Sequence, residues 1–98
     1  MELKIIATLT IQNEADEANE ANIVKALHTI VDATRKEEGN ISYELHQDIA
    51  NPKTYVFIEV WKSQEAIDAH NRSAHFLDFV KAVDGKVALA VNVIKKVY

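Results

Sequence analysis

The chain of 98 residues contains no cysteine, only two glycines and one proline. Without cysteine it can form neither disulfide bonds nor thiolate metal sites, and it has no cysteine nucleophile. This absence is typical of a protein kept in a reducing compartment. Because glycine and proline are so scarce, no segment has the composition of a flexible linker. We therefore expect a single domain spanning residues 1–98.

Clusters of positive charge and long apolar runs are also missing. The formal net charge is −4, and the lysines and arginines are scattered singly or in pairs, which argues against a nucleic-acid partner. The longest uninterrupted apolar run, Val87 to Val91, is far too short to span a membrane. The first residues lack the features of a signal peptide. We expect a cytoplasmic protein that binds neither nucleic acid nor membrane.

Alternating and helical hydrophobic periods divide the chain into seven elements. Strands are predicted over 3–11, 41–47, 54–62 and 87–97. A turn within 12–22 leads into a helix with an apolar stripe from Ile23 to Thr34, which we expect Gly39 to end. Two short helices then begin after Ser63 and Ser73, both good N-caps. This order predicts an α+β domain of the ferredoxin-like, split βαβ type with a four-stranded antiparallel sheet.

One face of such a sheet must find cover outside its own chain. The helices can cover only one face, yet Val56, Ile58 and Val60 make the opposite face of their strand apolar as well. The last strand is apolar on both faces, which predicts a central or sandwiched position. We therefore predict a homodimer that packs sheet against sheet.

The segment from Tyr55 to Val83 gathers most of the candidate site residues. Alternation places Tyr55, Phe57, Glu59 and Trp61 on one face of their strand. The two following helices carry further candidates: His70, His75, Phe76 and Phe79. An acid among aromatic side chains beneath helices that carry imidazoles indicates a small-molecule site rather than a plain core.

Four short motifs resemble the antibiotic biosynthesis monooxygenase family over nearly the whole chain. They are EGNISYEL at 38–45, E-x-W at 59–61, A-x3-H at 66–70 and S-x-HF at 73–76. The resemblance implies a dimeric α+β barrel with a pocket between helices and sheet in each protomer. It also implies one of three activities: quinol oxidation by oxygen without metal or flavin, haem degradation, or isomerisation of a small signal molecule. Ala7 and Val80 stand where haem-degrading members carry asparagine and histidine, which disfavours that branch.

The resemblance and the residues together predict a cofactor-independent monooxygenase that oxidises a small quinol or phenolic compound with O2. An ionised phenol can react with oxygen directly once a base has removed its proton. The predicted bases are Glu59, His70 and His75. The predicted substrate contacts come from Tyr43, Tyr55, Trp61, Phe76 and Phe79. No cofactor and no metal are expected, since His70 and His75 lie five residues apart across a helix break.

Structural roles for the same residues remain open at this point. Glu59 can be a buried acid with a structural partner, and Trp61 can simply fill the core. His70 can cap its helix by bonding carbonyl oxygens, while His75 sits in a first turn where exposure is common. Two other functions use the same pocket: isomerisation of a small keto signal molecule, or binding of a small molecule without turnover.

Overall fold

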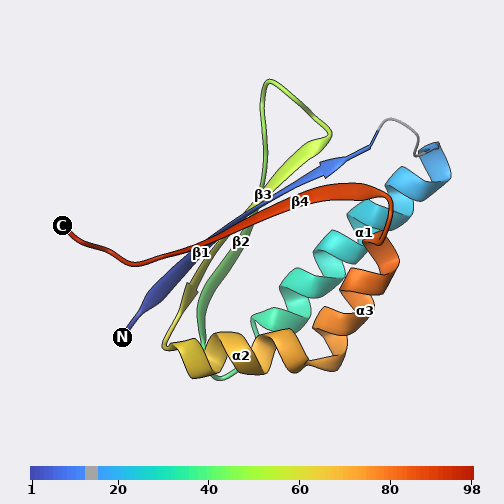
Figure 1. Ribbon diagram of the computed structural model, residues 1–98. Helices are drawn as coiled ribbons and strands as arrows, with labels where there is room; N and C mark the ends of the chain where they lie inside the picture. Colours follow the sequence, from blue (N-terminus) through green and yellow to red (C-terminus); the bar gives the residue numbers. More distant parts are fainter. Residues whose placement is uncertain (13–15) are drawn as a thin grey trace.

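A computed structural model describes residues 1–12 and 16–98, and the predicted turn after the first strand falls partly outside them. The three helices lie together on one face of a four-stranded sheet (Figure 1). The elements in chain order are β1 (Leu3–Ile11), α1 (Glu17–Thr34), β2 (Asn40–Gln47), β3 (Thr54–Trp61), α2 (Gln64–Arg72), α3 (Ala74–Val83) and β4 (Val87–Ile94). The α+β, ferredoxin-like architecture predicted from the sequence is confirmed.

The sheet has the strand order β2-β3-β1-β4, and all three pairings are antiparallel. Glu59 on β3 stands between Tyr43 of β2 and Ile5 of β1 in register. The side chains of neighbours in register share one face of the sheet, so these three residues form a row across it. That row faces the helices, and the candidate site is built on it.

Asp16 caps the N-terminus of helix α1: its carboxylate accepts a hydrogen bond of 2.8 Å from the backbone N–H of Asn19. Its buried stripe comprises Ile23, Leu27, Ile30, Val31 and Thr34. Each fully buried aliphatic side chain in such a stripe contributes about 1.5–3 kcal/mol. The helix ends at Thr34 and not at Gly39, so the prediction of its end was wrong. Residues 35–39 instead form a loop that passes beneath α2.

Gly39 is required where this loop meets α2. A Cβ built on Gly39 would lie much closer to the Cβ of Ala66 than van der Waals contact allows. We expect Gly39→Ala to lower the free energy of unfolding by about 1–3 kcal/mol, because the helix must shift to admit the methyl group. Urea unfolding measures the loss. In an Ala66→Gly background the loss should shrink by about 1 kcal/mol or more, whereas purely additive costs would show that the two residues do not collide.

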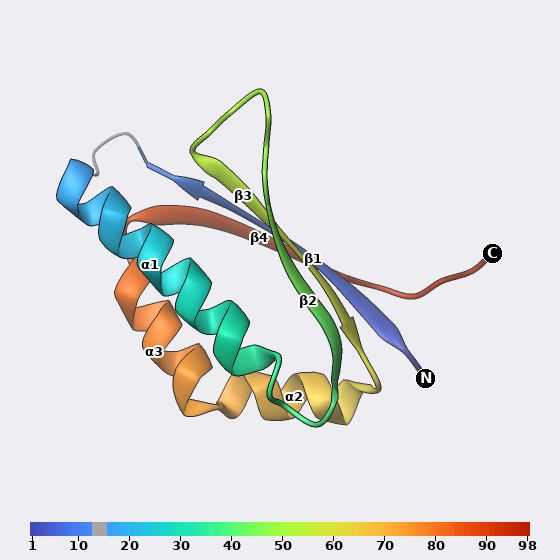
Figure 2. The ribbon, with the colours of Figure 1, turned by 180° about the vertical axis from the view of Figure 1, so that it is seen from behind.

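The core lies between the helices and the sheet, and it leaves two apolar surfaces uncovered. Central strand β1 is buried there through Ile5, Ala7, Leu9 and Ile11. Strand β4 lies at the edge of the sheet and not at its centre, so of the two predicted positions the central one was wrong, and a position sandwiched against another chain stays a prediction. On its helix-facing side Leu89, Val91 and Val93 are half exposed, since the helices do not reach that edge. The opposite sheet face, with Val56, Ile58 and Val60, is covered by none of the helices in the described part of the chain (Figure 2).

Candidate active site

Glu59 is buried at the middle of the helix-facing side of the sheet. Its side chain is 4% exposed, and its Oε1 accepts a hydrogen bond of 2.9 Å from Nε1 of Trp61. The bond forms because residues two apart on a strand share a face. Burial raises the pKa of Glu59 to about 7, helped by the nearby charge of Glu37 and opposed by the Trp61 hydrogen bond. An acid with this pKa exchanges protons readily near neutral pH.

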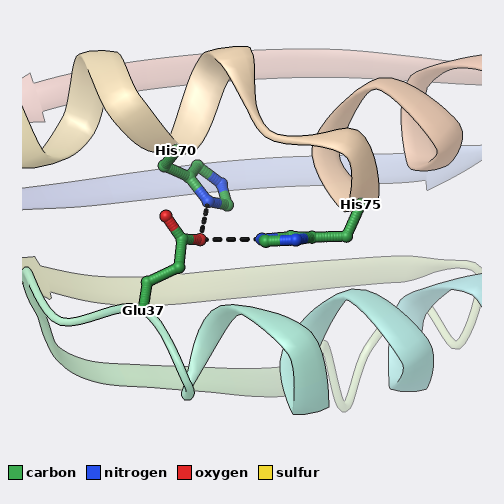
Figure 3. A group of neighbouring side chains, drawn as sticks. All are labelled: Glu37, His70 and His75. Atoms are coloured by element: carbon green, nitrogen blue, oxygen red, sulfur yellow. Dashed lines mark hydrogen bonds and ion pairs between the residues drawn. The ribbon is translucent and has the colours of Figure 1, made fainter.

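Both histidines of the predicted site converge on one carboxylate oxygen, that of Glu37 (Figure 3). Oε2 of Glu37 lies 2.6 Å from Nδ1 of His70 and 2.8 Å from Nε2 of His75. The three residues come from the last turn of α2, the first turn of α3 and the loop after α1. We call this group the Glu37 trio.

The junction at Ser73 brings the two rings of the trio together. The Ser73 hydroxyl donates to the carbonyl oxygen of His70 at 2.7 Å and accepts from the backbone N–H of Phe76 at 3.2 Å. It therefore closes α2 and caps α3 at the same residue. The extended backbone of Ser73 bends the chain there, so that His70 and His75 approach Glu37 from two directions.

The hydrogen bonds of the trio determine which ring nitrogens are occupied. An ionised carboxylate can only accept, so Nδ1 of His70 and Nε2 of His75 are both donors. In the neutral rings, Nε2 of His70 and Nδ1 of His75 are then the nitrogens that can take up a proton. Burial lowers the pKa of His70, while the hydrogen bond and charge of Glu37 oppose this and the neighbouring His75 adds to it. A neutral His70 is a ready proton acceptor.

A cavity of about 370 Å³ lies between the sheet and the helices, directly over Glu59 and His70. Its walls are mostly apolar or aromatic: Ile5, Ala7, Tyr43, Phe57, Glu59, His70, Asn71, Phe76, Phe79, Leu89 and Val91. Burial raises the pKa of Tyr43 well above its usual range, with Glu59 and Glu37 nearby, so Tyr43 stays a neutral phenol. The cavity thus offers two proton acceptors and one neutral hydroxyl in an apolar setting.

The predicted site residues occupy four places in the structure. Those that line the cavity are Tyr43, Glu59, His70, Phe76 and Phe79. Trp61 is fully buried beside them, where it bonds Glu59 and its ring centroid lies 4.8 Å from that of His70. His75 lies outside the cavity lining and faces a groove between α1 and α3. Tyr55 lies next to Pro52 and Lys53, four residues before Glu59 on β3. Four residues of strand span about 13 Å, so Tyr55 lies beyond the cavity.

Glu37 is the site residue that the sequence did not reveal. Its place in the charged run RKEE at 35–38 is typical of a solvated helix end, yet its side chain is only 17% exposed. The helix ends before it, and the following loop turns it inward under α2. His70 likewise does not cap its helix through the ring, which bonds Glu37 instead. The only hint in the sequence is that Glu37 directly precedes the EGN motif.

The trio contains the donor types of a metal site, one carboxylate and two imidazoles. Among the described residues, it is the set of three such side chains whose donor atoms all lie within 4.8 Å of one another. Two ligands of one tetrahedral ion, each about 2.0–2.1 Å from it, lie roughly 3.3 Å apart. The nitrogen to oxygen distances of 2.6 and 2.8 Å are shorter and are those of hydrogen bonds. The carboxylate oxygen itself fills the space between the two rings, so we treat the trio as a hydrogen-bonded network.

The raised pKa of Glu59 predicts how stability depends on pH. Because the folded protein holds this proton up to a pKa of about 7 and an unfolded chain only to about 4.5, ionisation of Glu59 destabilises the fold as the pH rises between those values. Relative to Glu59→Gln, the free energy of unfolding of the parent should fall by roughly 3 kcal/mol or less as the pH rises across this window. Urea unfolding of both proteins at about pH 5 and about pH 8 measures the difference. A constant difference would show that Glu59 is not buried as an acid.

The fold and the cavity define a class of protein: a ferredoxin-like α+β domain with an acid–base pocket between its sheet and its helices. Residues 4–82 match the family model described as antibiotic biosynthesis monooxygenase, and the chain belongs to that family. The match includes the loop, strands and helices that carry the Glu37 trio and Glu59. It supports a monooxygenase-type function.

Individual relatives agree with this assignment. YcnE of Bacillus subtilis (strain 168), named as a candidate monooxygenase, is 40% identical over 52 residues, which are 53% of this chain and 55% of YcnE. The matched segment therefore spans about half the length of that relative. A crystal structure of an antibiotic biosynthesis monooxygenase is 28% identical, with a TM-score of 0.87 over 98% of this chain and 99% of its own. A candidate family member from Nitrosomonas europaea, 18% identical with a TM-score of 0.86, covers 99% of this chain and 91% of its own and shares the fold.

None of the described helices combines the length and the apolar character that crossing a membrane would require.

Proposed function

We propose that the protein is a monooxygenase that oxidises a small quinol or phenolic compound with O2, using neither metal nor flavin. The observation that carries the proposal is the pairing of Glu59 and His70 on one cavity of about 370 Å³ with aromatic walls. That volume lies at the lower end of small-molecule pockets and suits a molecule of one or two rings. Two proton acceptors are what the chemistry needs, because oxygen insertion removes one proton from a hydroxyl and one from a ring carbon.

His70 is suited to the first step. Its Nε2 takes the hydroxyl proton of the substrate, and the Glu37 carboxylate stabilises the imidazolium that forms. The phenolate passes one electron to O2, and the two radicals combine to form a bond between oxygen and a ring carbon. The His70 imidazolium then protonates the peroxide, which returns His70 to its neutral state.

Glu59 is suited to the second step. Its carboxylate removes the hydrogen, as a proton, from the carbon that carries the peroxide, while the O–O bond breaks and hydroxide leaves. The hydroxide takes the proton from Glu59, so the phenolic O–H, the ring C–H and O2 together become two carbonyl groups and one water. With a pKa of about 7, Glu59 can accept and release this proton in turn. The mostly apolar walls give the reacting ring a surrounding of low polarity.

The test is oxygen uptake by the purified, metal-stripped protein with a panel of reduced benzoquinols and naphthoquinols, corrected for autoxidation. We expect uptake that saturates with at least one quinol and is unchanged by added chelator. Absence of uptake above background with every quinol would overturn the proposal. Product formed from a small keto compound without oxygen would then favour an isomerase, and tight binding without turnover would favour a binding module.

The proposed partners are the small aromatic substrate, O2 and a second copy of the chain. The face of the sheet away from the helices carries Val56, Ile58 and Val60, and no described helix covers it. On this face edge strand β4 adds the exposed side chains of Ala88, Ala90 and Ile94. A homodimer that packs sheet against sheet would cover this face, as the family resemblance implies. We propose a cytoplasmic protein without nucleic-acid or membrane partners.

A further inference from the structure

Two separate hollows of the molecule meet at the Glu37 trio. The cavity over Glu59 is lined by His70 but not by His75. A groove of about 290 Å³ between α1 and α3 is lined by His75 but not by His70. Oε2 of Glu37 bonds both rings and is the direct connection between them.

The two rings differ sharply in their access to solvent. The side chain of His70 is 4% exposed, and its ring is surrounded by those of Tyr43, Trp61 and Phe76 at centroid distances of 4.8–5.8 Å. The side chain of His75 is 27% exposed and stands in the groove with Lys25 and Asp78. The ring of His70 is therefore screened from bulk solvent, whereas that of His75 is partly exposed to it.

We infer that His75 exchanges protons between the groove and the buried trio, so that each proton that His70 takes from a molecule in the cavity is matched by one that His75 releases. The carboxylate of Glu37 carries one negative charge and can fully balance only one imidazolium at a time. When Nε2 of His70 gains a proton, a protonated His75 loses the one on its Nδ1. The trio keeps its charge, no electrons move, and both rings keep their N–H bonds to Glu37.

This exchange suits a cavity that carries other charges close by. Glu59 and Tyr43 face His70 from the sheet, and a second uncompensated charge next to them would be costly in an apolar site. Lys25 of α1 and Asp78 of α3 line the same groove as His75. The inference uses the proposed function only in taking His70 as the base. His75 and Glu37 act through His70 and are positioning residues.

The first test needs neither substrate nor oxygen. Side-chain ¹⁵N NMR of histidine-labelled protein measures the protonation of each ring against pH. In His75→Gln, whose amide N–H can still donate to Glu37, we expect His70 to take up its proton about one pH unit higher than in the parent, since the competing charge is gone. In Glu37→Gln we expect His70 to take up its proton at a lower pH than in the parent, because the charge of Glu37 is gone. His46→Gln, which changes an exposed histidine on β2, should leave His70 unchanged.

The second test follows the released proton. 4-Nitrophenol, whose phenolate is yellow, is bound anaerobically at a pH where the free compound is neutral, in weak buffer with a pH indicator. For the parent we expect phenolate and about one proton released per site, and for His75→Gln phenolate with the proton retained. The inference would be overturned if the parent formed phenolate without releasing a proton. It would also be overturned if His70 titrated in His75→Gln at the same pH as in the parent. Neither test uses oxygen, so each can fail while quinol oxidation stands, and the reverse also holds.

Discussion

Oxygen uptake with a quinol substrate is expected to fall by about 10²–10⁴-fold when Glu59 is replaced with glutamine, the range by which a positioned acid or base accelerates reactions. The substitution keeps the size of the side chain, and its amide oxygen can still accept the N–H of Trp61, which lies 2.9 Å from Oε1. The cavity should therefore persist, and what is lost is the group that removes the proton from the ring carbon. The change should appear in kcat with little change in KM.

Two matched controls separate this loss from general damage. Glu65→Gln makes the same chemical change at an exposed position in the first turn of α2, outside the cavity lining and away from the sheet face proposed to pack against a second copy. Tyr55→Phe removes a hydroxyl from the same face of β3 as Glu59, outside the cavity lining. Both should keep uptake within about twofold, as surface substitutions usually do. A Glu59→Gln protein with normal uptake would leave His70 as the only base and contradict the second step.

The pH profile of the parent provides an independent check on the same residue. Since Glu59 acts as an ionised base, uptake should increase as the pH rises through its pKa of about 7. In Glu59→Gln the residual uptake should not show this increase.

The fold could be predicted because hydrophobic period and capping chemistry act locally. Alternation located β1 and β3 closely, and Ser63 and Ser73 cap α2 and α3 through their hydroxyls as expected. The position of β4 could not be obtained in this way. A strand that is apolar on both faces is consistent with a central position or with cover by another chain, and pairing order depends on contacts distant in sequence.

The site could be predicted only where its residues lie on regular elements. Glu59 and Trp61 share a strand face, and His70 and His75 flank a recognisable cap, so period and spacing pointed to all four. Glu37 lies in a loop, and no period fixes the direction of a loop side chain. Tyr55 shows the opposite limit: its face was correct, but alternation does not reveal how far along the sheet a cavity extends.

Placing a charge at Ile58 is expected to convert the protein from a dimer to a monomer of 11.0 kDa. Ile58 lies on the uncovered face of β3 between Val56 and Val60, the surface proposed to pack against a second copy. In a twofold interface the substitution enters twice, once from each protomer. Burying an unpaired charge costs several kcal/mol, so the dissociation constant should rise by roughly 10²-fold or more. Analytical ultracentrifugation measures the mass directly.

Two variants place a positive or a negative charge at position 58, and a third variant at an exposed surface position serves as the control. Lysine at position 58 would face Glu44, its neighbour in register, and could be neutralised by it, so Ile58→Glu is measured beside Ile58→Lys. Ile49→Lys adds the same charge in place of a fully exposed isoleucine in the β2–β3 turn and should leave the dimer intact. Each variant must unfold cooperatively in urea, since a monomer that forms by unfolding says nothing about the face. If both Ile58 variants stay folded at the mass of the parent, the second copy packs elsewhere, and the half-exposed helix-facing side of β4, with Leu89, Val91 and Val93, becomes the surface to substitute next.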